Sequence, residues 1–240
     1  MKGLKLILLL AATLVEAGCG LPDQYFIQSP ILGTFAGGTG NQFNFLNPDH
    51  TKDLNITFKG YELYYQFYPQ NATININPYD PNNTADVYTQ LTTAGYKLMT
   101  SSADLYPNRT DPVIPIAVSD IGSSFSVTVQ ITTAVTPPAQ AAQYTTTAST
   151  LGFGNLRRNV QDATIGAPYY PNYKDFQYNI ATPLNYAITD QDCGNILSFV
   201  TGSGNYVWIA VFAASYGLIG VSTPQRSVPI YLGYLTVQIN

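Results

Sequence analysis

The chain of 240 residues is poor in charge, because Lys, Arg, Asp and Glu make up 10% of it and its formal net charge at pH 7 is −4. An average soluble domain carries roughly 25% charged residues. Nucleic acid is therefore not expected as a partner, since scattered cations cannot form the basic face that neutralises phosphates. Tyr, Thr, Asn, Gly and Pro are plentiful, and this composition favours strands joined by turns.

Residues 1–18 have the features of a signal peptide. Lys2 and Lys5 provide a positive start, and residues 6–15 form an apolar run. A run of this length is read by the export machinery and is too short to span a bilayer. We therefore expect an exported protein whose signal peptide is removed.

Cys19 is the predicted site of lipid attachment. Ala17 and Gly18 supply the small residues that a lipoprotein signal peptidase needs, whereas Glu16 stands where Leu, Val or Ile is usual. Each buried methylene contributes about 0.8 kcal/mol, so several acyl chains, palmitate among them, hold a protein on a membrane. Asp23 is not adjacent to Cys19, where an aspartate can signal inner-membrane retention. We expect anchoring on the extracytoplasmic side, at the outer membrane or cell surface.

Two alternatives stay open for Cys19. An ordinary signal peptidase can cut after Ala17 or Gly18, and Cys19 would then pair with Cys193, the only other cysteine, in an oxidising compartment. Alternatively, the segment is retained as an uncleaved anchor, which its short apolar run argues against. If Cys19 is acylated, Cys193 is expected to be a buried lone thiol.

The first half of the body predicts short strands. Residues 19–40 are expected to form the tether and a first edge strand, and residues 41–240 a single elaborated β domain. Strands are predicted at residues 43–46 and 54–58, and most clearly at residues 60–68. One face of that last strand is expected to be core and the other aromatic and solvated. The core positions are Tyr61, Leu63, Tyr65 and Phe67.

The middle of the chain predicts one helix among further strands. A short strand is predicted at residues 72–76. Apolar residues recur at spacings near three and four over residues 84–98, which predicts the helix. Residues 123–131 return to strand periodicity. Residues 132–150 form either an interdomain linker or, as we favour, a surface excursion.

The last third predicts three successive strands, and with them a resemblance. These strands cover residues 195–201, 205–215 and 227–239. GYELYYQFY at residues 60–68 resembles the tyrosine-bearing strand of a fibronectin type III domain, and YVWIAVFAASYG with VPIYLGYLTVQI resembles its penultimate and last strands. The resemblance implies a mainly β, fibronectin III/immunoglobulin-like sandwich with a large insertion, about residues 70–195, containing one short helix.

The same strand order below an imperfect lipobox resembles the lipoproteins of spirochaetes. The lipobox of these proteins tolerates departures such as Glu16. The resemblance covers about a quarter of the chain and consists of strand patterns, so no functional residue is carried over from it.

The sequence offers little catalytic chemistry. His50 is the one histidine, and no nucleophile motif accompanies it. Glu62, the one glutamate after the signal peptide, lies on the strand face expected to be solvated, so a glycosidase pair of carboxylates is not favoured. One histidine and two cysteines are too few for zinc. We expect a protein that is not an enzyme and that needs no cofactor.

Two short polar motifs are candidate ion sites. Asp190 and Asp192 precede Gly194 as in an oxygen-ligand loop for calcium, but the distal glutamate of such loops is absent, and Asx turns are the simpler interpretation. Arg157 and Arg158 can clamp a carboxylate or sulfate, although a solvated or aspartate-paired surface doublet is the simpler expectation. No metal site is therefore predicted beyond this weak calcium candidate.

Tyrosines are the candidate ligand contacts, because Tyr supplies large and rigid contact area. They lie on the strand at residues 60–68 and in a later aromatic loop; the candidates are Tyr61, Tyr64, Tyr68, Tyr169, Tyr170 and Tyr173. Packing along strands is the simpler hypothesis for most of them.

Three functional hypotheses follow from these observations, and the least favoured is an envelope hydrolase, which would need two carboxylates facing each other in one pocket. The first is a non-catalytic cell-envelope lipoprotein that acts as a structural module or by surface contact with a protein or glycan partner. The alternative is a lipoprotein that binds a glycan or small ligand through a Tyr-rich face. A cleft with stacked aromatic residues favours the alternative, and closed flat sheets favour the first hypothesis.

Overall fold

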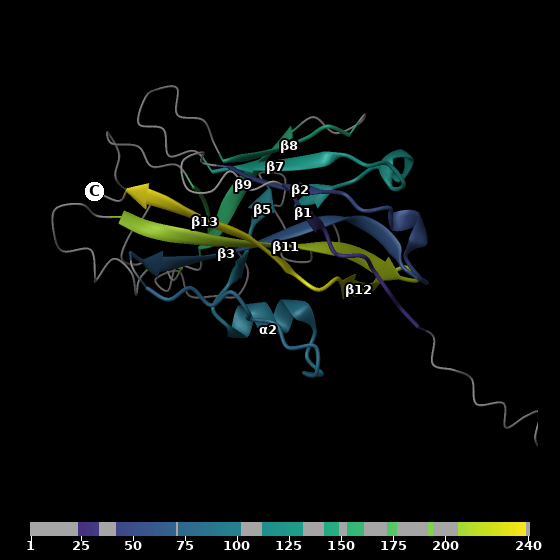
Figure 1. Cartoon of the computed structure of the whole chain (residues 1–240), viewed down its shortest axis with the longest axis horizontal. Helices are drawn as coiled ribbons and strands as arrows, with labels where there is room; N and C mark the ends of the chain where they lie inside the picture. The colour runs from purple at the N-terminus through teal and green to yellow at the C-terminus, as the bar shows by residue number, and fades with distance from the viewer. Residues whose placement is uncertain are drawn as a thin grey trace, which may run out of the picture.

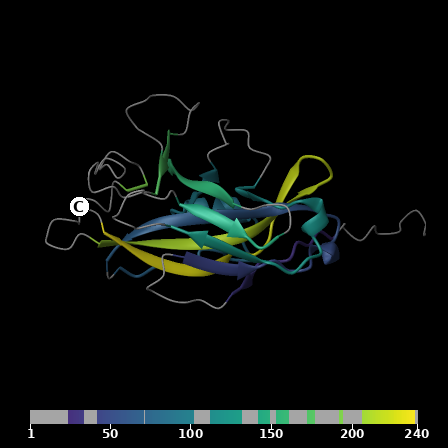
Figure 2. The same cartoon turned by 90° about the horizontal axis from the view of Figure 1, so that it is seen from above.

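The computed structural model describes residues 24–33, 42–70, 72–101, 112–131, 142–148, 153–160, 172–176, 192–193 and 206–238. Within these ranges two antiparallel sheets lie face to face, and one α-helix lies on the outside of one sheet (Figure 1 and Figure 2). The prediction of a mainly β fold with one short helix is confirmed for this part of the chain.

The first sheet is built mainly from the middle of the chain. Its strand order is β1–β2–β7–β8–β9–β10, with β5 beside β9, and every pair is antiparallel. Its strands are β1 (Ile31–Leu32), β2 (Gln42–Leu46), β5 (Thr100–Ser101), β7 (Ser126–Gln130), β8 (Gln143–Thr146), β9 (Phe153–Val160) and β10 (Asn172–Asp175).

The second sheet is built around two long central strands, β3 and β11. These pair with each other along nearly their whole length, from Val207–Pro69 to Leu218–Thr57. β13 and β12 share the other edge of β11, while β4 and β6 share the other edge of β3. Its strands are β3 (Thr57–Pro69), β4 (Lys97–Leu98), β6 (Ile114–Pro115), β11 (Tyr206–Ile219), β12 (Thr223–Arg226) and β13 (Ile230–Gln238).

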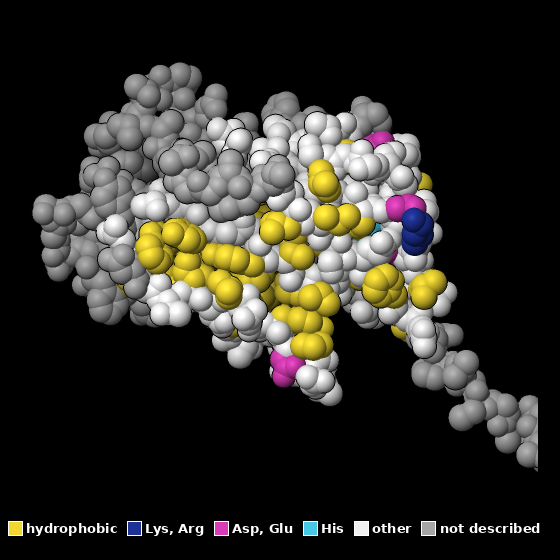
Figure 3. Space-filling view, in the orientation of Figure 1, with side chains coloured by type: hydrophobic (Ala, Val, Ile, Leu, Met, Phe, Trp, Pro, Cys, Tyr) yellow, Lys and Arg dark blue, Asp and Glu magenta, His cyan; other side chains and the backbone are white. Residues whose placement is uncertain are grey.

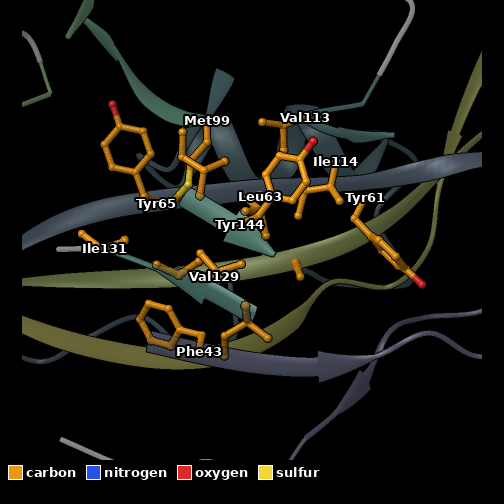
Figure 4. Packing of buried hydrophobic residues seen from close by; sticks show 14 of the residues in the cluster. Phe43, Tyr61, Leu63, Tyr65, Met99, Val113, Ile114, Val129, Ile131 and Tyr144 are labelled. Atoms are coloured by element: carbon orange, nitrogen blue, oxygen red, sulfur yellow. The ribbon is translucent and has the colours of Figure 1, made fainter. Parts of the chain in front are cut away.

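The main core lies between the two sheets. Tyr61, Leu63 and Tyr65 of β3 are fully buried there, together with Val129 of β7 and the nearly buried Tyr144 of β8 (Figure 4). β7 to β9 come from the segment that the sequence assigned to an insertion, and their inward side chains belong to this core. Burial of this apolar area, at roughly 25 cal/mol per Å², is the main source of stability.

The helix α2 (Val87–Thr93) is shorter than the predicted span of residues 84–98. Asp86 caps its N-terminus by accepting a hydrogen bond from the Thr89 backbone N–H at 2.9 Å. Gly95, with a φ of 97°, ends the helical region, and the chain then enters β4. In the described ranges no helix is long and apolar enough to cross a membrane.

The outer face of β3 is buried as well, which corrects the expectation of a solvated face. Tyr64 is fully buried and Tyr68 is 9% exposed, because α2 and its flanking segments cover them. They pack with Leu91 of α2 and Phe212 of β11 in a second apolar cluster. Alternation fixes which side chains share a face of a strand, but it does not say whether another layer covers that face.

The remaining strand predictions differ in outcome. The two predicted strands at residues 54–58 and 60–68 form one strand, β3, although Leu54 itself makes only an isolated bridge. Residues 72–76 were predicted as a strand and contain none. β2, β7, β11 and β13 overlap their predicted positions. The strand predicted at residues 195–201 lies outside the described residues.

Candidate functional site

The candidate site is an open groove on the outer side of the second sheet. It has a volume of about 430 Å³, within the range of small-molecule sites. Ile74 and Ile76 form one wall, Leu32 of β1 contributes to the rim, and β11 and β13 form the floor. Hydrophobic side chains gather in a band on this face of the molecule (Figure 3).

A β-bulge places two tyrosines of β13 in the floor of the groove. Two consecutive residues of β11 pair with Gly233 and Tyr231, so Leu232 is an extra residue in β13. In a regular strand, residues three apart point to opposite faces, but the bulge brings Tyr231 to the same side as Tyr234. Gly233 has a φ of 122°, a conformation that favours glycine.

Trp208 of β11 completes the aromatic floor. Its ring centroid lies 4.7 Å from that of Tyr234, with 40° between the ring planes. Trp208 is partly buried, and Tyr234 is 39% exposed. The two rings therefore present a joint aromatic surface that a ligand can contact without displacing core side chains.

The groove continues the apolar cluster that α2 covers. Ile74, Trp208 and Tyr231 pack against that cluster from its open side. The rings of Tyr231 and Phe212 have centroids 5.1 Å apart, which links the groove floor to the covered cluster. One apolar layer is thus closed by a helix in one half and open in the other.

Among the described residues, the lining of the groove carries no charged side chain and no carboxamide. Its side-chain polar groups are the hydroxyls of Tyr231 and Tyr234 and the indole N–H of Trp208. Burial, with smaller contributions from Tyr234 and Tyr68, raises the pKa of Tyr231 to about 12, so this hydroxyl stays uncharged at neutral pH. Such a lining suits a ligand that is uncharged and largely apolar.

Glu62 is engaged in a buried ion pair in the covered half of the layer. Arg226 donates from Nε to Glu62 Oε2 at 2.6 Å and from Nη2 to Oε1 at 3.1 Å, and Tyr64 also donates to Oε2. Burial opposes the charge of Arg226, but the carboxylate of Glu62 raises the pKa of Arg226 overall. Both oxygens of the one glutamate after the signal peptide thus serve an internal contact, and the expectation of a solvated Glu62 is wrong.

His50 lies in the 3-10 helix η1 (His50–Lys52) and is buried rather than in an exposed loop. Its Nδ1 is 2.7 Å from Asp53 Oδ2, and its Nε2 is 3.4 Å from the hydroxyl of Tyr61. The ring stacks on Phe58 with centroids 3.5 Å apart. The histidine therefore belongs to a buried polar network and does not reach the groove.

Asp192 and Arg158 pair with each other. Arg158 Nη1 lies 3.0 and 2.9 Å from the two carboxylate oxygens of Asp192 and 3.0 Å from the Sγ of Cys193, and Tyr65 donates to Asp192 at 2.7 Å. Both charged side chains are buried, so Arg158 is paired with an aspartate, as one alternative held, but inside the protein rather than at its surface. A carboxylate neutralised in this way is not available to calcium.

No other metal site takes its place in the described ranges, where no group of three or more His, Cys, Asp or Glu side chains is placed to hold a metal ion. Asp190, the partner of Asp192 in the calcium hypothesis, lies outside these ranges.

Three of the predicted ligand-contact tyrosines, Tyr61, Tyr64 and Tyr68, do not form an exposed face. Tyr61 is in the main core, whereas Tyr64 and Tyr68 lie on the opposite face of β3 beneath α2. Tyr173 pairs with Asn159 through the backbone of β10. The other three predicted residues lie outside the described part of the chain: Tyr169, Tyr170 and Cys19.

Sequence reasoning missed the aromatic residues that do line the groove. Trp208, Tyr231 and Tyr234 were assigned to strands without a ligand role. The available signal was Gly233, because a glycine inside a strand pattern often marks a bulge.

Comparisons of the chain with protein-family models, with curated proteins and with solved structures found no significant match.

Proposed function

We propose that the protein is an exported lipoprotein, anchored through Cys19, that binds a small, uncharged and largely apolar ligand without catalysing a reaction. The observation that carries this proposal is the open groove with its aromatic floor of Trp208, Tyr231 and Tyr234 and its lack of charged lining. A groove with neighbouring aromatic rings favours ligand binding over contact between flat surfaces. The tyrosines that serve are different from those the sequence suggested.

The chemistry of the lining favours an apolar ligand over a glycan. A glycan presents many hydroxyls, and each one that is desolvated without a partner costs free energy. The groove offers three side-chain polar groups, on Trp208, Tyr231 and Tyr234, among aliphatic and aromatic walls. An acyl chain or a fused-ring hydrocarbon needs no further hydrogen-bonding groups than these three.

The position of Cys193 supports the lipid anchor over a disulfide with Cys19. Cys193 is buried, and its Sγ lies 3.0 Å from the Nη1 of buried Arg158. A disulfide there would replace the thiol that the Nη1 of Arg158 contacts. With Cys19 acylated, the groove-bearing body would stand on the extracytoplasmic side, at the outer membrane or cell surface.

We further propose a fibronectin III/immunoglobulin-like relationship for the fold. The neighbour order β3–β11–β13 is the order of strands C, F and G in that class. The first sheet departs from that class. In its order A–B–E–D, β7 takes the place of strand E and β8 that of strand D, but D precedes E in the chain of that class, whereas β8 and β9 follow β7.

The groove proposal is tested with 1-N-phenylnaphthylamine, an uncharged apolar fluorophore. The protein is produced from residue 19 onward with Cys19→Ala, and probe emission is followed during titration. We expect saturable binding at one site, and Tyr234→Ala is expected to weaken it about tenfold, since a buried aromatic contact contributes about 1.5 kcal/mol or more. Val118→Ala, at an 81% exposed position outside the groove lining, is the matched control.

Equal probe affinity in the Tyr234→Ala and Val118→Ala variants would contradict the groove assignment. Binding of chitotriose in place of the apolar probe, with the same loss in Tyr234→Ala, would favour the glycan alternative. For the anchor, Cys19→Ala in the full-length chain is expected to abolish fatty-acid labelling and membrane partitioning, and unchanged labelling would contradict lipidation.

A further inference from the structure

The end of the body nearest the N-terminal tether carries exposed apolar side chains. Phe26 and Leu54 form an isolated antiparallel bridge and exchange two backbone hydrogen bonds of 3.2 and 2.9 Å. Residues directly opposite in such a bridge project to the same face. Their side chains are 53% and 50% exposed, and the neighbouring Tyr25 is 44% exposed. These residues, with Val221, are called the tether-end surface below.

The tether-end surface is held in place by the body. Asn55 Nδ2 donates to the Gln24 carbonyl at 3.0 Å, and the Gln28 backbone N–H donates to Asp53 Oδ1 at 3.0 Å. The segment that carries Tyr25 and Phe26 is thereby fixed along its length. Exposed apolar side chains that gather in one patch mark an interaction site, whereas single ones do not.

Val221 lies at the same end of the second sheet. Leu218–Thr57 is the last pair of the β3–β11 ladder. Leu54 lies three residues before Thr57, and Val221 lies three residues after Leu218, in the turn between β11 and β12. Val221 is 93% exposed. Apolar side chains from two separate parts of the chain therefore point into solvent at one end of the molecule.

The short spacing to Cys19 keeps the tether-end surface close to the bilayer if Cys19 is acylated. Cys19 precedes Gln24 by five residues, and a fully extended chain of that length spans at most about 18 Å. An acylated Cys19 sits at the bilayer surface, so the tether-end surface is confined to the neighbourhood of the lipid headgroups. Apolar and aromatic side chains at such a boundary gain free energy by entering the headgroup and acyl region.

We propose that the tether-end surface contacts a phospholipid bilayer and inserts Phe26, Leu54 and Val221 into it; this rests on the proposed lipidation of Cys19. The contact fixes the orientation of the body. Trp208 lies ten residues before Leu218 on β11, which is about 33 Å along a strand. The groove is thereby held away from the bilayer and takes its ligand from the aqueous side.

Single-tryptophan variants of the full-length acylated protein test this orientation. Trp208 is the only tryptophan, so Phe26→Trp and Val221→Trp are each combined with Trp208→Phe, and the unsubstituted protein supplies the groove-side control. Each protein is reconstituted into phosphatidylcholine vesicles with and without bromine on the acyl chains. Both reporters are expected to lose most of their emission in brominated vesicles, whereas the emission of Trp208 is expected to be unchanged.

Three outcomes would overturn all or part of the inference. If the variant proteins float with the vesicles but their introduced tryptophans keep their emission in brominated vesicles, the lipid anchor stands and the bilayer contact is wrong. If the protein carries no fatty-acid label and does not float, the anchor itself is wrong and the bilayer contact fails with it. Quenching of Trp208 along with the reporters would contradict the orientation.

Discussion

The two halves of the outer layer on the second sheet show how one apolar surface can serve two ends. In the covered half, α2 closes over Tyr64, and Glu62 and Arg226 form a buried ion pair beside it. In the open half, Trp208 and Tyr231 belong to the same layer but border a groove. Apolar side chains line both halves, but α2, which is seven residues long, covers only one of them, and the other half stays open as a groove.

Breaking the ion pair is expected to have the largest effect and to act on the covered half. Arg226→Met leaves Glu62 charged and buried without its partner, which we expect to lower the free energy of unfolding by about 3–5 kcal/mol. Urea denaturation measures this change. Lys52→Met, which removes an exposed partner of Asp49, is the control and is expected to change little. Equal stability of the two variants would contradict the role given to Arg226.

Truncating the side chain by which α2 packs on the sheet should lower the free energy of unfolding by less than the loss of the ion pair does. Leu91 is fully buried under α2, and Leu91→Ala is expected to cost about 2–5 kcal/mol through lost transfer free energy and a cavity. Thermal unfolding is the measurement, with Val118→Ala as the exposed control. Because Leu91 does not line the groove, the folded variant should bind the apolar probe as before; a large loss of affinity would mean that the halves are not independent.

The bulge in β13 should be needed by the open half alone. A Cβ at Gly233 strains a backbone with a φ of 122°, and we expect Gly233→Ala to turn Tyr231 away and to weaken probe binding by about tenfold, as backbone strain of 1–3 kcal/mol implies. Gly220 also has a positive φ of 61° and lies in an open turn, so Gly220→Ala is the matched control. Equal probe affinity in the Gly233→Ala and Gly220→Ala variants would show that the bulge is not needed for binding.

Alkaline pH should have a smaller effect, shared by both halves. Burial raises the pKa of Tyr64 well above its ordinary value and that of Tyr231 to about 12. The unfolded-state pKa is about 10, so the contribution of these hydroxyls is complete below pH 10 and is lost as the pH rises toward the folded-state values. The free energy of unfolding, measured by urea denaturation at each pH, should be constant to about pH 9 and fall above pH 10, while tyrosinate absorbance follows ionisation of the hydroxyls. A fall beginning near pH 8 would contradict this.

The strands β2, β3, β7, β11 and β13 were predictable from the sequence, because alternation of apolar side chains is a local property. β8 lies in the segment predicted as a linker or surface excursion, and β9 was not predicted. Leu63 and Tyr65 were correctly placed in the core, and Tyr61 lies there too, although it was also named as a candidate ligand contact. The burial of Tyr64 was not predicted, because it depends on where a helix more than twenty residues away comes to lie. Side-chain patterns along one strand carry no information on a second covering layer.

Ion pairs and the groove were not predictable for a related physical reason. Glu62 meets Arg226, and Arg158 meets Asp192, across long sequence separations that only the topology brings together. The groove depends on the bulge at Leu232 in addition to the aromatic content of β13. Gly233 was the one local sign of that bulge, and a glycine alone does not tell which neighbouring side chains change face.

The most direct test of the central claim uses Trp208, the one tryptophan, as an energy donor inside the groove. 1-N-phenylnaphthylamine is added to the lipid-free protein carrying Cys19→Ala, and both emissions are recorded. We expect the Trp208 emission to fall in step with the rise in probe emission and to saturate at one probe per chain. In Gly233→Ala the same transfer should need about tenfold more probe. Probe binding without energy transfer from Trp208, or no saturable binding, would contradict ligand binding in the groove.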